Sequence, residues 1–412
     1  MDIVRDPLWN NIRLDRLALA LVDTGAMQRL RYVRQLGLAH LVYPGATHTR
    51  FEHALGTYHL ARLTLGILQD RGDLRSLPTD EPAVVLAAAL LHDIGHYPFA
   101  HALEEIGAPH HEDVGHTLIT SGDVAELLAR HIAPDAPARV AAVVRATSDS
   151  PLQGLVSGSL DLDKIEYLKR DAHMCGVPYG EIDVDRLINS LALVRLDAGD
   201  RARTVVGITE KGLSALESLL FAKYQMYRNV YWHHAVRSAT AMYKRTVGSA
   251  LASGALAVNR LPSFTDEQLL QHLAEVAPSE MLTRLRQRRL YKRAFECPAA
   301  ELPEDAGEWI ASDPARTAAA ERDLAAELGL ADGEVLLDYP EKTQMLDLDL
   351  PVQLRSGVVS RLTSEGLPGV IHLPELSAQL YKSARWLRIF TARPSTITKS
   401  RVLELVASVQ IP

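Results

Sequence analysis

The spacing of apolar residues over the first 250 positions is typical of helices. Apolar side chains recur every three to four residues, the period of one face of an α-helix, and residues 83–91 are apolar throughout, as in a helix buried on every side. The last segment of this part is long enough to bend or break. The pattern predicts helices over residues 15–36, 49–69, 83–91, 111–132, 136–147, 158–172, 183–194 and 209–250.

After about residue 255 the pattern becomes mixed. Asp313 and Pro314 suit the first positions of a helix and Gly329 suits its end, which predicts a helix to Leu328. Residues 346–350 alternate with period two and residues 386–390 are similar, so both are predicted strands. The fold class is therefore mainly α. We expect an all-helical domain over residues 1–250 and a smaller α+β region over residues 251–412.

Composition and charge exclude some classes of protein. The 412 residues carry a formal net charge of −7, whereas proteins that track nucleic acid are usually basic. Cys175 and Cys297 are too few for a disulfide framework. The N-terminus is charged and lacks an apolar signal core, and residues 83–91 are too short to cross a membrane. We expect a cytoplasmic protein without a membrane anchor and without strong nucleic-acid binding.

Histidines are concentrated in one part of the chain. Ten of the 16 lie between His40 and His116. Scattered surface histidines would not cluster in this way, so the clustering raises the expectation of a metal or acid–base site.

The pair His92-Asp93 follows the apolar segment directly. An imidazole and a carboxylate buried at the end of such a helix would be costly unless they were paired or bound to a metal. Together they form a mixed nitrogen and oxygen ligand set, suited to Mn, Fe, Co, Ni, Zn or Mg. Taken alone, the pair is explained equally well as a helix C-terminus with a solvated acid.

Two further blocks carry polar residues at helical spacing. Arg50-Phe51-Glu52-His53 lies upstream, on another predicted helix. Downstream, Asp163, Tyr167 and Asp171 are four residues apart and therefore share one helix face. This face could be a solvated stripe, an explanation that fits Asp171 better than Tyr167.

The order His53, His92-Asp93, Asp163 resembles the H…HD…D signature of the HD superfamily of metal-dependent phosphohydrolases. Residues 1 to about 245 resemble its deoxynucleoside triphosphate (dNTP) triphosphohydrolase branch, which includes the mammalian SAM- and HD-domain enzymes and bacterial relatives. The blocks that carry the resemblance are residues 28–37, 43–46, 50–56, 92–99, 111–112 and 161–171.

The resemblance implies a role for individual residues and one divalent transition metal per active site (Mn, Fe, Co, Ni or Zn), with additional Mg accompanying the nucleotide. Asp163 is preferred to Asp161 because the family's ligand precedes the lysine matched by Lys164. The implied metal ligands are His53, His92, Asp93 and Asp163. The implied catalytic residues are His96, Glu104 and His111. The implied substrate-binding residues are Gln35, Arg50, His101, Lys164, Tyr167, Asp171 and Arg228.

Two positions depart from the mammalian enzymes. Glu104 stands where they carry an aspartate, so its longer side chain could reposition the acid–base relay. Trp232 stands where they carry a histidine on the base side, so base recognition could differ. His233 or Tyr231 could still line the pocket.

The expected reaction is hydrolysis of a dNTP to a deoxynucleoside and inorganic triphosphate. Alternatives are an HD phosphatase of nucleoside mono- or diphosphates or of alarmones, and a nucleotide-sensing HD module without turnover. The resemblance also implies a homo-oligomer, a dimer or tetramer, and in some members a nucleotide activator at a subunit interface near the position of Arg31. A solvated basic helix face explains Arg31 equally well.

Overall fold

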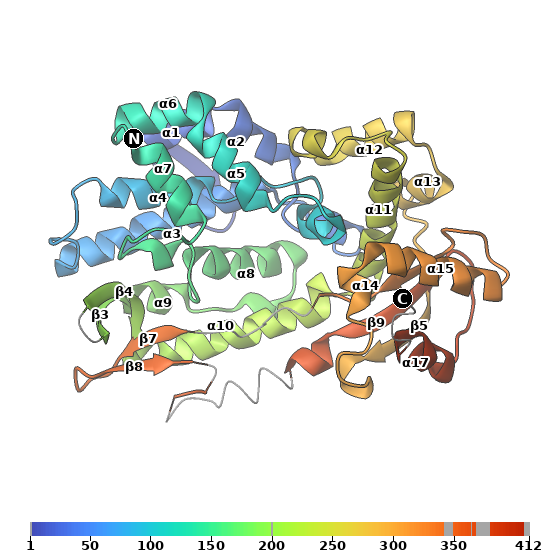
Figure 1. The fold of residues 1–412 in the computed structure, drawn as a ribbon. Helices are drawn as coiled ribbons and strands as arrows, with labels where there is room; N and C mark the ends of the chain where they lie inside the picture. The colour runs from blue at the N-terminus through green and yellow to red at the C-terminus, as the bar shows by residue number, and fades with distance from the viewer. Residues whose placement is uncertain (1, 199–200, 342–348, 364, 368–379, 408–412) are drawn as a thin grey trace.

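The computed structural model describes residues 2–198, 201–341, 349–363, 365–367 and 380–407, and shows a mainly helical molecule with small sheets (Figure 1). The helices of its first part are α1 (Arg16–Val22), α2 (Gly25–Arg29), α3 (Arg50–Arg71), α4 (Glu81–Leu91), α5 (His111–Thr120), α6 (Gly122–His131), α7 (Ala136–Val144), α8 (Leu162–Cys175), α9 (Val184–Ser190) and α10 (Leu213–Met226). Those of its second part are α11 (His234–Ala252), α12 (Asp266–Val276), α13 (Glu280–Arg286), α14 (Trp309–Ser312), α15 (Pro314–Glu327) and α17 (Lys399–Ala407).

The strands of the described residues form three separate sheets. The first is the antiparallel hairpin of β1 (Asp2–Asp6) and β2 (Asn10–Leu14). The second has the order β3 (Leu191–Ala198), β4 (Arg201–Thr209), β7 (Leu350–Gln353) and β8 (Val359–Leu362), with β4 and β7 parallel. The third has the order β5 (Lys292–Pro298), β9 (Trp386–Thr391) and β6 (Val335–Asp338), all antiparallel.

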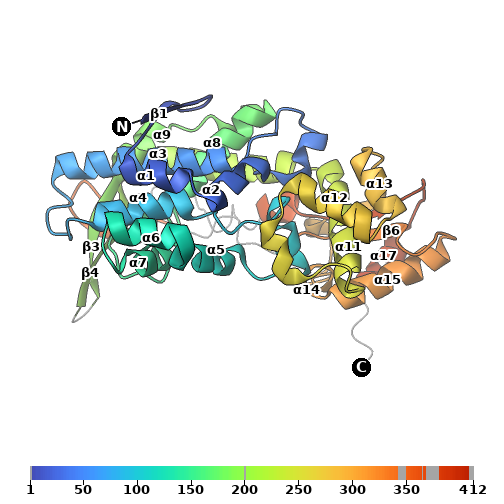
Figure 2. The same cartoon turned by 90° about the horizontal axis from the view of Figure 1, so that it is seen from above.

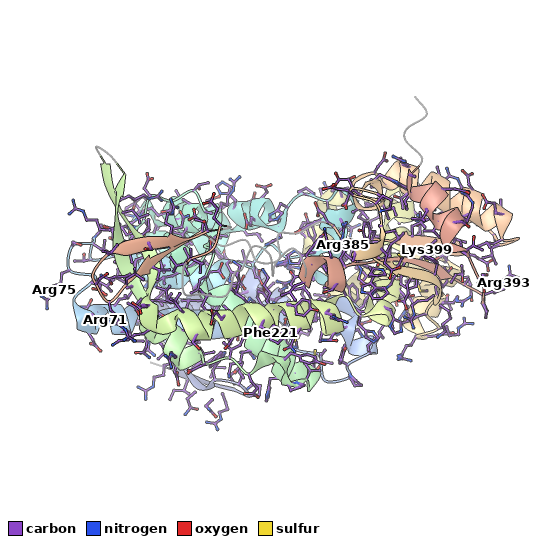
Figure 3. The ribbon with its side chains drawn as sticks, turned by 90° about the horizontal axis from the view of Figure 1, so that it is seen from below. Arg71, Arg75, Phe221, Arg385, Arg393 and Lys399 are labelled. Carbon is purple, nitrogen blue, oxygen red and sulfur yellow. The ribbon has the colours of Figure 1, made fainter. Side chains whose placement is uncertain are left out.

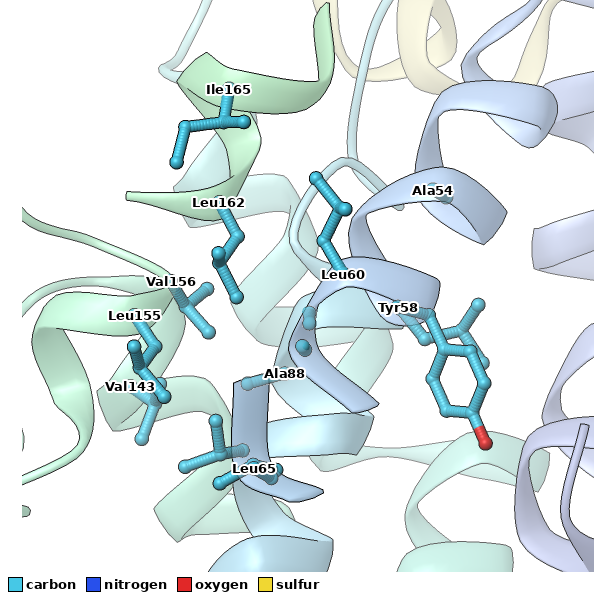
Figure 4. Packing of buried hydrophobic residues seen from close by; sticks show 14 of the residues in the cluster. Ala54, Tyr58, Leu60, Leu65, Ala88, Val143, Leu155, Val156, Leu162 and Ile165 are labelled. Atoms are coloured by element: carbon cyan, nitrogen blue, oxygen red, sulfur yellow. The ribbon is translucent and has the colours of Figure 1, made fainter. Parts of the chain in front are cut away.

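Helices α3, α4 and α8 pack against one another around the main apolar core. Figure 4 shows this packing, with Tyr58 and Leu60 from α3, Ala88 from α4 and Leu162 and Ile165 from α8. All five side chains are fully buried or nearly so. Because protein cores are closely packed, their backbones have little freedom to move apart. The core therefore fixes the helices on which the predicted metal ligands lie.

A capping box defines where α3 begins. The Thr49 side chain accepts a hydrogen bond from the Glu52 amide, and the Glu52 side chain accepts one from the Thr49 amide. Such reciprocal bonds satisfy amides that the first helical turn leaves without partners. They set the start of α3 just before Arg50, so that His53 falls at the end of the first turn.

The second part of the chain lies beside the first, as the views from the side and from above show (Figures 1 and 2). A separate apolar cluster joins α11, α12 and α13 to Phe99 and Leu103 of the first part. Helix α10 runs along the underside of the molecule, where Phe221 is half exposed (Figure 3). No helix among the described residues has the length and apolar character that a membrane span requires.

Several expected elements are confirmed. The predicted helices over residues 49–69, 83–91 and 136–147 correspond to α3, α4 and α7. The predicted helix after Asp313 is α15, in which the Asp313 side chain accepts from the Arg316 amide at 2.9 Å and Gly329 has a φ of +67°. The predicted strand over residues 386–390 is β9.

Other expectations were wrong in their extent. Residues 15–36 are α1 and α2 followed by a single 3₁₀ turn, because Thr24 adopts an extended conformation between them. The segment 111–132 divides into α5 and α6 at Ser121, which is also extended. Residues 158–172 become helical only at Leu162, after the N-cap Asp161.

Two segments predicted as helices contain strand or a break. Helix α9 ends at Ser190, where the chain enters β3, and β4 extends to Thr209 before α10 begins. The segment 209–250, which was expected to bend or break, is broken by a π-helix, Tyr227–Tyr231. The first part of the chain is therefore not all-helical, since it also holds the hairpins β1–β2 and β3–β4.

The expected strand over residues 346–350 falls mainly outside the described residues, since β7 begins at Leu350. The expected boundary near residue 250 stays a prediction. Helix α11 ends at Ala252, yet β7 returns from the second part of the chain to pair with β4, and β8 pairs with β7.

Candidate active site

The four residues predicted as metal ligands meet at one point. His53 lies on α3, His92 and Asp93 follow the end of α4, and Asp163 lies in the first turn of α8. His53 Nε2 is 3.1 Å from His92 Nε2, 2.9 Å from Asp163 Oδ1 and 3.6 Å from Asp93 Oδ2. His92 Nε2 is 3.5 Å from Asp163 Oδ1 and 3.6 Å from Asp93 Oδ1. Donor atoms of His53, His92 and Asp93 lie close enough together to hold one ion, and Asp163 Oδ1 adjoins both imidazole nitrogens.

The hydrogen bonds of the two imidazoles test whether a cation fits there. His53 Nδ1 is 2.6 Å from Glu166 Oε2, and His92 Nδ1 is 3.0 Å from the Ala89 carbonyl oxygen. Each Nδ1 therefore donates its proton, and in the neutral tautomer both Nε2 atoms are acceptors. Two nitrogen lone pairs and two carboxylates then face one another. This arrangement calls for a positive charge between them, and a divalent metal with nitrogen and oxygen ligands provides it.

The pKa shifts of these residues also indicate that a positive charge is favoured between them. Burial acts to lower the pKa of His53, but hydrogen bonds to Asp163 and Glu166 raise that pKa to about 10. Burial acts to raise the pKa of Asp93, yet Arg50 and His92 hold it well below its ordinary value. A cation at this point is thus strongly favoured by the surrounding carboxylates.

Glu166 hydrogen-bonds the Nδ1 atom of His53, and the sequence analysis did not predict this contact. Its Oε1 accepts hydrogen bonds from Trp9 Nε1 at 2.9 Å and from Arg170 Nε at 2.7 Å, while Oε2 binds His53. Arg170 also donates to Asp6 at 3.0 Å, which ties the β1–β2 hairpin to the site. A carboxylate bonded to the second nitrogen of a ligand histidine fixes its tautomer and orientation. The available signal was the position of Glu166, three residues after Asp163 on the same helix.

Gly56 leaves room for the Glu166 side chain because it has no Cβ atom. A Cβ at this position would overlap Glu166 Oε1 and lie 2.9 Å from Arg170 Nη2. Gly56→Ala would gain about 1 kcal/mol of helix propensity at an exposed site. Here we expect a net loss of stability of about 1–3 kcal/mol, because a buried and bonded carboxylate must move. Denaturant unfolding checks the sign, and Gly66→Ala, whose Cβ meets nothing within 4 Å on the same helix, is the control. Equal stabilisation of both variants would contradict the tight packing at Gly56.

A cavity of about 1010 Å³ opens beside the four donors. It is large enough for a nucleotide. His92, Asp93 and Asp163 line it, whereas His53 is fully buried behind them. The other predicted site residues that line it are Gln35, Arg50, His96, His101, Glu104, His111, Lys164, Tyr167 and Asp171.

The structure does not bring Arg228 to this cavity. It lies in the π-helix, is exposed, and donates to the Tyr224 hydroxyl at 2.7 Å. Its neighbours Tyr227, Tyr231 and Trp232 line the cavity instead. The wider turn of a π-helix changes which side chains face inward, and a helical reading of the sequence cannot foresee this. The wall near Trp232 is thus aromatic.

Glu104 binds two of the histidines that line the cavity, His101 and His111. Its Oε1 is 2.7 Å from His111 Nδ1 and accepts the His111 amide at 3.1 Å, and its Oε2 is 3.1 Å from His101 Nδ1. Burial opposes ionisation, but the hydrogen bonds to His101 and His111 hold the pKa of Glu104 far below its ordinary value. Glu104 is therefore a carboxylate, and it directs the Nε2 atoms of both histidines away from itself.

His96 is buried and stacks on His111 with ring centroids 3.9 Å apart. Its Nε2 lies 3.2 Å from Asp93 Oδ1. Burial, Arg50 and His111 hold the pKa of His96 well below its ordinary value, so the ring is neutral near neutral pH. His96 thus separates the metal-ligand cluster from the His111–Glu104 pair.

The charges that line the cavity are mostly negative. Eight carboxylates line it, against three cationic side chains. Each cation is already paired: Arg50 with Asp93 at 2.6 Å, Lys164 with Asp161 at 2.5 Å, and Arg237 with Asp338 at 2.5 Å. An anionic ligand would therefore depend on bound metal for much of its charge compensation. Sequence reasoning missed Arg237, whose partner lies about a hundred residues away in β6.

Comparison with known protein families agrees with this geometry. Residues 50–168 match the HD domain, and residues 182–365 match the HD associated region. The matched HD domain spans His53, His92, Asp93 and Asp163. The chain belongs to the HD superfamily of phosphohydrolases, and its own HD core is followed by a region that contains sheets.

Individual relatives include proteins of known and unknown function. The chain is 34% identical over 293 residues to an uncharacterized protein of Methanocaldococcus jannaschii, covering 71% of this chain and 59% of that protein. It is 26% identical over 269 residues to human deoxynucleoside triphosphate triphosphohydrolase SAMHD1, covering 57% of this chain and 42% of the human enzyme. The chain thus spans about half the length of these curated relatives.

Two solved structures share the fold over nearly the whole chain. A hypothetical protein from Aquifex aeolicus has a TM-score of 0.72 at 27% identity, over 98% of this chain and 99% of its own. A phosphohydrolase from Bacteroides thetaiotaomicron has a TM-score of 0.73 at 24% identity, over 95% of this chain and 100% of its own. The second likeness bears on the fold alone.

Proposed function

We propose that the protein is a metal-dependent dNTP triphosphohydrolase that releases a deoxynucleoside and inorganic triphosphate. The observation that carries this proposal is the cluster in which the Nε2 atoms of His53 and His92 lie 2.9–3.6 Å from carboxylate oxygens of Asp93 and Asp163, beside a cavity of about 1010 Å³. The similarity to an enzyme named as a dNTP triphosphohydrolase supports the choice of substrate.

A bound divalent metal supplies Lewis-acid catalysis, since it polarises a phosphoryl oxygen and lowers the pKa of water. In the proposed reaction a water oxygen attacks the α-phosphorus and the bond from phosphorus to the 5′-oxygen breaks. The 5′-oxygen takes up a proton as the deoxynucleoside departs. The triphosphate keeps the oxygen that came from water.

Proton transfer to the 5′-oxygen is the role we propose for His111. Its Nδ1 donates to Glu104, so His111 would act in its doubly protonated form, in which Nε2 carries the second proton that passes to the 5′-oxygen. Arg50 and Lys164, beside Asp93 and Asp161, would contact the phosphate oxygens and offset their charge. His101 shares the Glu104 carboxylate and lies at the exposed side of this group.

His111→Ala should lower kcat by roughly 10²- to 10⁴-fold, the usual contribution of a general acid, and leave the metal in place. Steady-state kinetics and metal analysis of the same preparation check both parts. His131→Ala, an exposed histidine at the end of α6, is the matched control. If kcat were unchanged in His111→Ala, the proton donor would have to be another residue.

A second candidate function is a phosphatase of nucleoside mono- or diphosphates. The exposed position of Arg228 favours it, because the cavity then offers Arg50 and Lys164 as the cations beside the metal-ligand cluster. Two such cations match the negative charge of one or two phosphate groups better than the charge of a triphosphate.

A substrate panel distinguishes the two. The Mn²⁺-loaded protein is incubated separately with each dNTP, each ribonucleoside triphosphate, the deoxynucleoside mono- and diphosphates and a guanosine alarmone, and with a dNTP mixture to reveal activation. Chromatography with separate detection of triphosphate and orthophosphate identifies the products. We expect deoxynucleoside and intact triphosphate from dNTPs. Orthophosphate from monophosphates, with dNTPs untouched, would replace the first proposal by the second.

Mn²⁺ as the metal, a homo-oligomeric state and activation by a nucleotide stay predictions from the family resemblance. The clustered histidine and carboxylate donors support a divalent metal without selecting one. Competition between metals would test the choice of Mn²⁺. Light scattering with and without nucleotide would test the oligomeric state and its response to a nucleotide.

A further inference from the structure

The turn that precedes two of the candidate acid–base residues has a strained backbone. Phe99 and Ala100 have φ values of +59° and +64°, so two consecutive residues with a Cβ atom lie in the left-handed region. This region is disfavoured for such residues because the Cβ atom crowds the backbone. The 3₁₀ helix that follows, Ala100–Ile106, carries His101 and Glu104. The position of both side chains therefore depends on how the turn is held in place.

Asp266, the first residue of α12, binds this turn from the second part of the chain. Its Oδ1 accepts a hydrogen bond from the Phe99 amide at 2.9 Å. Its Oδ2 accepts from the Arg34 amide at 3.0 Å and from Arg34 Nη1 at 3.2 Å. Asp266 is almost fully buried and does not line the cavity. Because both of its oxygens are bonded, the carboxylate fixes the Phe99 amide relative to Arg34.

The segment around Arg34 is a rigid support for this contact. Arg34 forms an antiparallel β-bridge with Thr49, directly before α3. The Arg50 amide donates to the Val33 carbonyl oxygen at 2.9 Å, which fixes the register of the two segments. Asp266 thus connects the left-handed turn to the beginning of α3, the helix that carries a predicted metal ligand.

Two other side chains bind carbonyl oxygens shortly before the turn. Arg29 Nη2 donates to the carbonyl oxygens of Ile94 and His96 at 3.2 and 2.7 Å. The Tyr243 hydroxyl, on α11, donates to the Pro98 carbonyl oxygen at 3.1 Å. The backbone that leads into the turn is therefore also held, and part of this restraint comes from a second helix of the second part of the chain.

The restraint reaches the proposed proton donor through Glu104. Glu104 accepts from His111 Nδ1 at 2.7 Å and from His101 Nδ1 at 3.1 Å. A carboxylate orients an imidazole and stabilises its protonated form only while the two stay within hydrogen-bond distance. A displacement of about 1 Å in such a group can lower a rate by roughly 100-fold. A shift of the 3₁₀ helix would therefore reduce proton transfer by His111.

We infer that Asp266 is a positioning residue, which holds the left-handed turn at Phe99 and Ala100 and thereby keeps Glu104 within reach of His111. This inference rests on the proposed function, since it concerns protonation of the leaving group. It gives α12 a part in the reaction, although Asp266 lies outside the cavity.

Asp266→Asn tests the inference in the Mn²⁺-loaded full chain. The asparagine amide offers one acceptor oxygen in place of two, so either the Phe99 amide or the Arg34 amide loses its acceptor. We expect the rate constant of dNTP hydrolysis to fall by roughly 10- to 100-fold, the cost of a displaced catalytic group, with metal content unchanged. Single turnovers with protein in excess give a rate constant that does not depend on the fraction of folded molecules.

A change of leaving group separates positioning from a general loss of structure. In 4-nitrophenyl triphosphate, 4-nitrophenolate takes the place of the deoxynucleoside and departs without a proton, so the reaction does not need His111 as an acid. For this substrate the rate constant of Asp266→Asn should fall by less than about threefold, because only general acid catalysis is impaired.

Glu267→Gln is the matched control. Glu267 is the next residue on α12, is exposed, and also pairs with Arg34, with its Oε1 3.5 Å from Nη2. Its substitution removes the same charge without changing the acceptor of the Phe99 amide, so both rate constants should equal those of the wild-type protein. Tyr243→Phe removes the donor to the Pro98 carbonyl oxygen. It should show a smaller loss of the same kind, and it replaces Asp266→Asn if that variant does not fold.

Amide hydrogen exchange tests the restraint without any turnover. Exchange in peptides that cover residues 94–106 should be faster in Asp266→Asn than in the wild-type protein, because a lost contact makes local opening easier. The same peptides should exchange at the wild-type rate in Glu267→Gln.

An unchanged dNTP rate constant in folded Asp266→Asn would overturn the inference, and so would equal losses with the two leaving groups. If the substrate panel identifies a phosphatase, a deoxynucleoside monophosphate is compared with 4-nitrophenyl phosphate in the same way. A loss confined to the nucleotide in that comparison would support the inference and reject the triphosphohydrolase proposal.

Discussion

Replacing His92 with alanine should remove the metal and abolish hydrolysis together. His92 Nε2 lies within 3.6 Å of donor atoms of His53, Asp93 and Asp163, so its loss leaves one side of the proposed metal open. A metal contributes several kcal/mol to such reactions and about 1.36 kcal/mol corresponds to tenfold in rate. We expect kcat to fall by roughly 10³-fold or more. Metal content by mass spectrometry and kcat are measured on the same sample.

Folding must be separated from metal loss in this experiment. His92 lines the cavity and its side chain is partly exposed there, so the apo variant should retain its helical circular dichroism. His272→Ala, on the distant α12, is the control and should keep both metal and activity. A metal-free His92→Ala protein that hydrolyses at the wild-type rate would refute the role of the metal.

Glu166→Gln should weaken metal binding by roughly 10- to 100-fold, the range observed when an outer carboxylate is removed from a ligand histidine. The amide keeps the shape of the side chain but can present an N–H to His53 Nδ1, which favours the wrong tautomer. Glu166 is fully buried and also binds Trp9 and Arg170, so it cannot turn away. Mn²⁺ titration gives the dissociation constant.

Saturating Mn²⁺ should restore much of the activity of Glu166→Gln, because the four ligands remain. Glu181→Gln, at an exposed position just beyond α8, should bind metal as the wild-type protein does. Unchanged metal affinity in Glu166→Gln would show that His53 is oriented by its packing alone.

The local sequence pattern was sufficient for α3 and α4, two of the three helices that carry the predicted metal ligands. A capping box before Arg50 and an unbroken apolar segment before His92 are strong local signals, and both helices form where expected. The strand β3 was missed because residues 183–194 read equally well as a helix. Only the pairing of β3 with β4 decides that segment.

The order of the histidines and aspartates along the chain suggested the predicted metal ligands, but not the residues that support them. Glu166 meets His53 across 113 positions, and His48 meets Asp171 across 123. No spacing within one helix reveals such contacts. Arg228 shows the opposite case: its position in the sequence suggested a phosphate contact, and a π-helix carries it to the surface.

The most direct measurement is an anomalous difference map from crystals of the Mn²⁺-loaded protein, recorded above the manganese edge. The account predicts one strong peak per chain, within about 2.0–2.3 Å of donor atoms of His53, His92, Asp93 and Asp163. A strong peak bound elsewhere, or none between these four side chains in crystals that contain stoichiometric Mn²⁺, would contradict it.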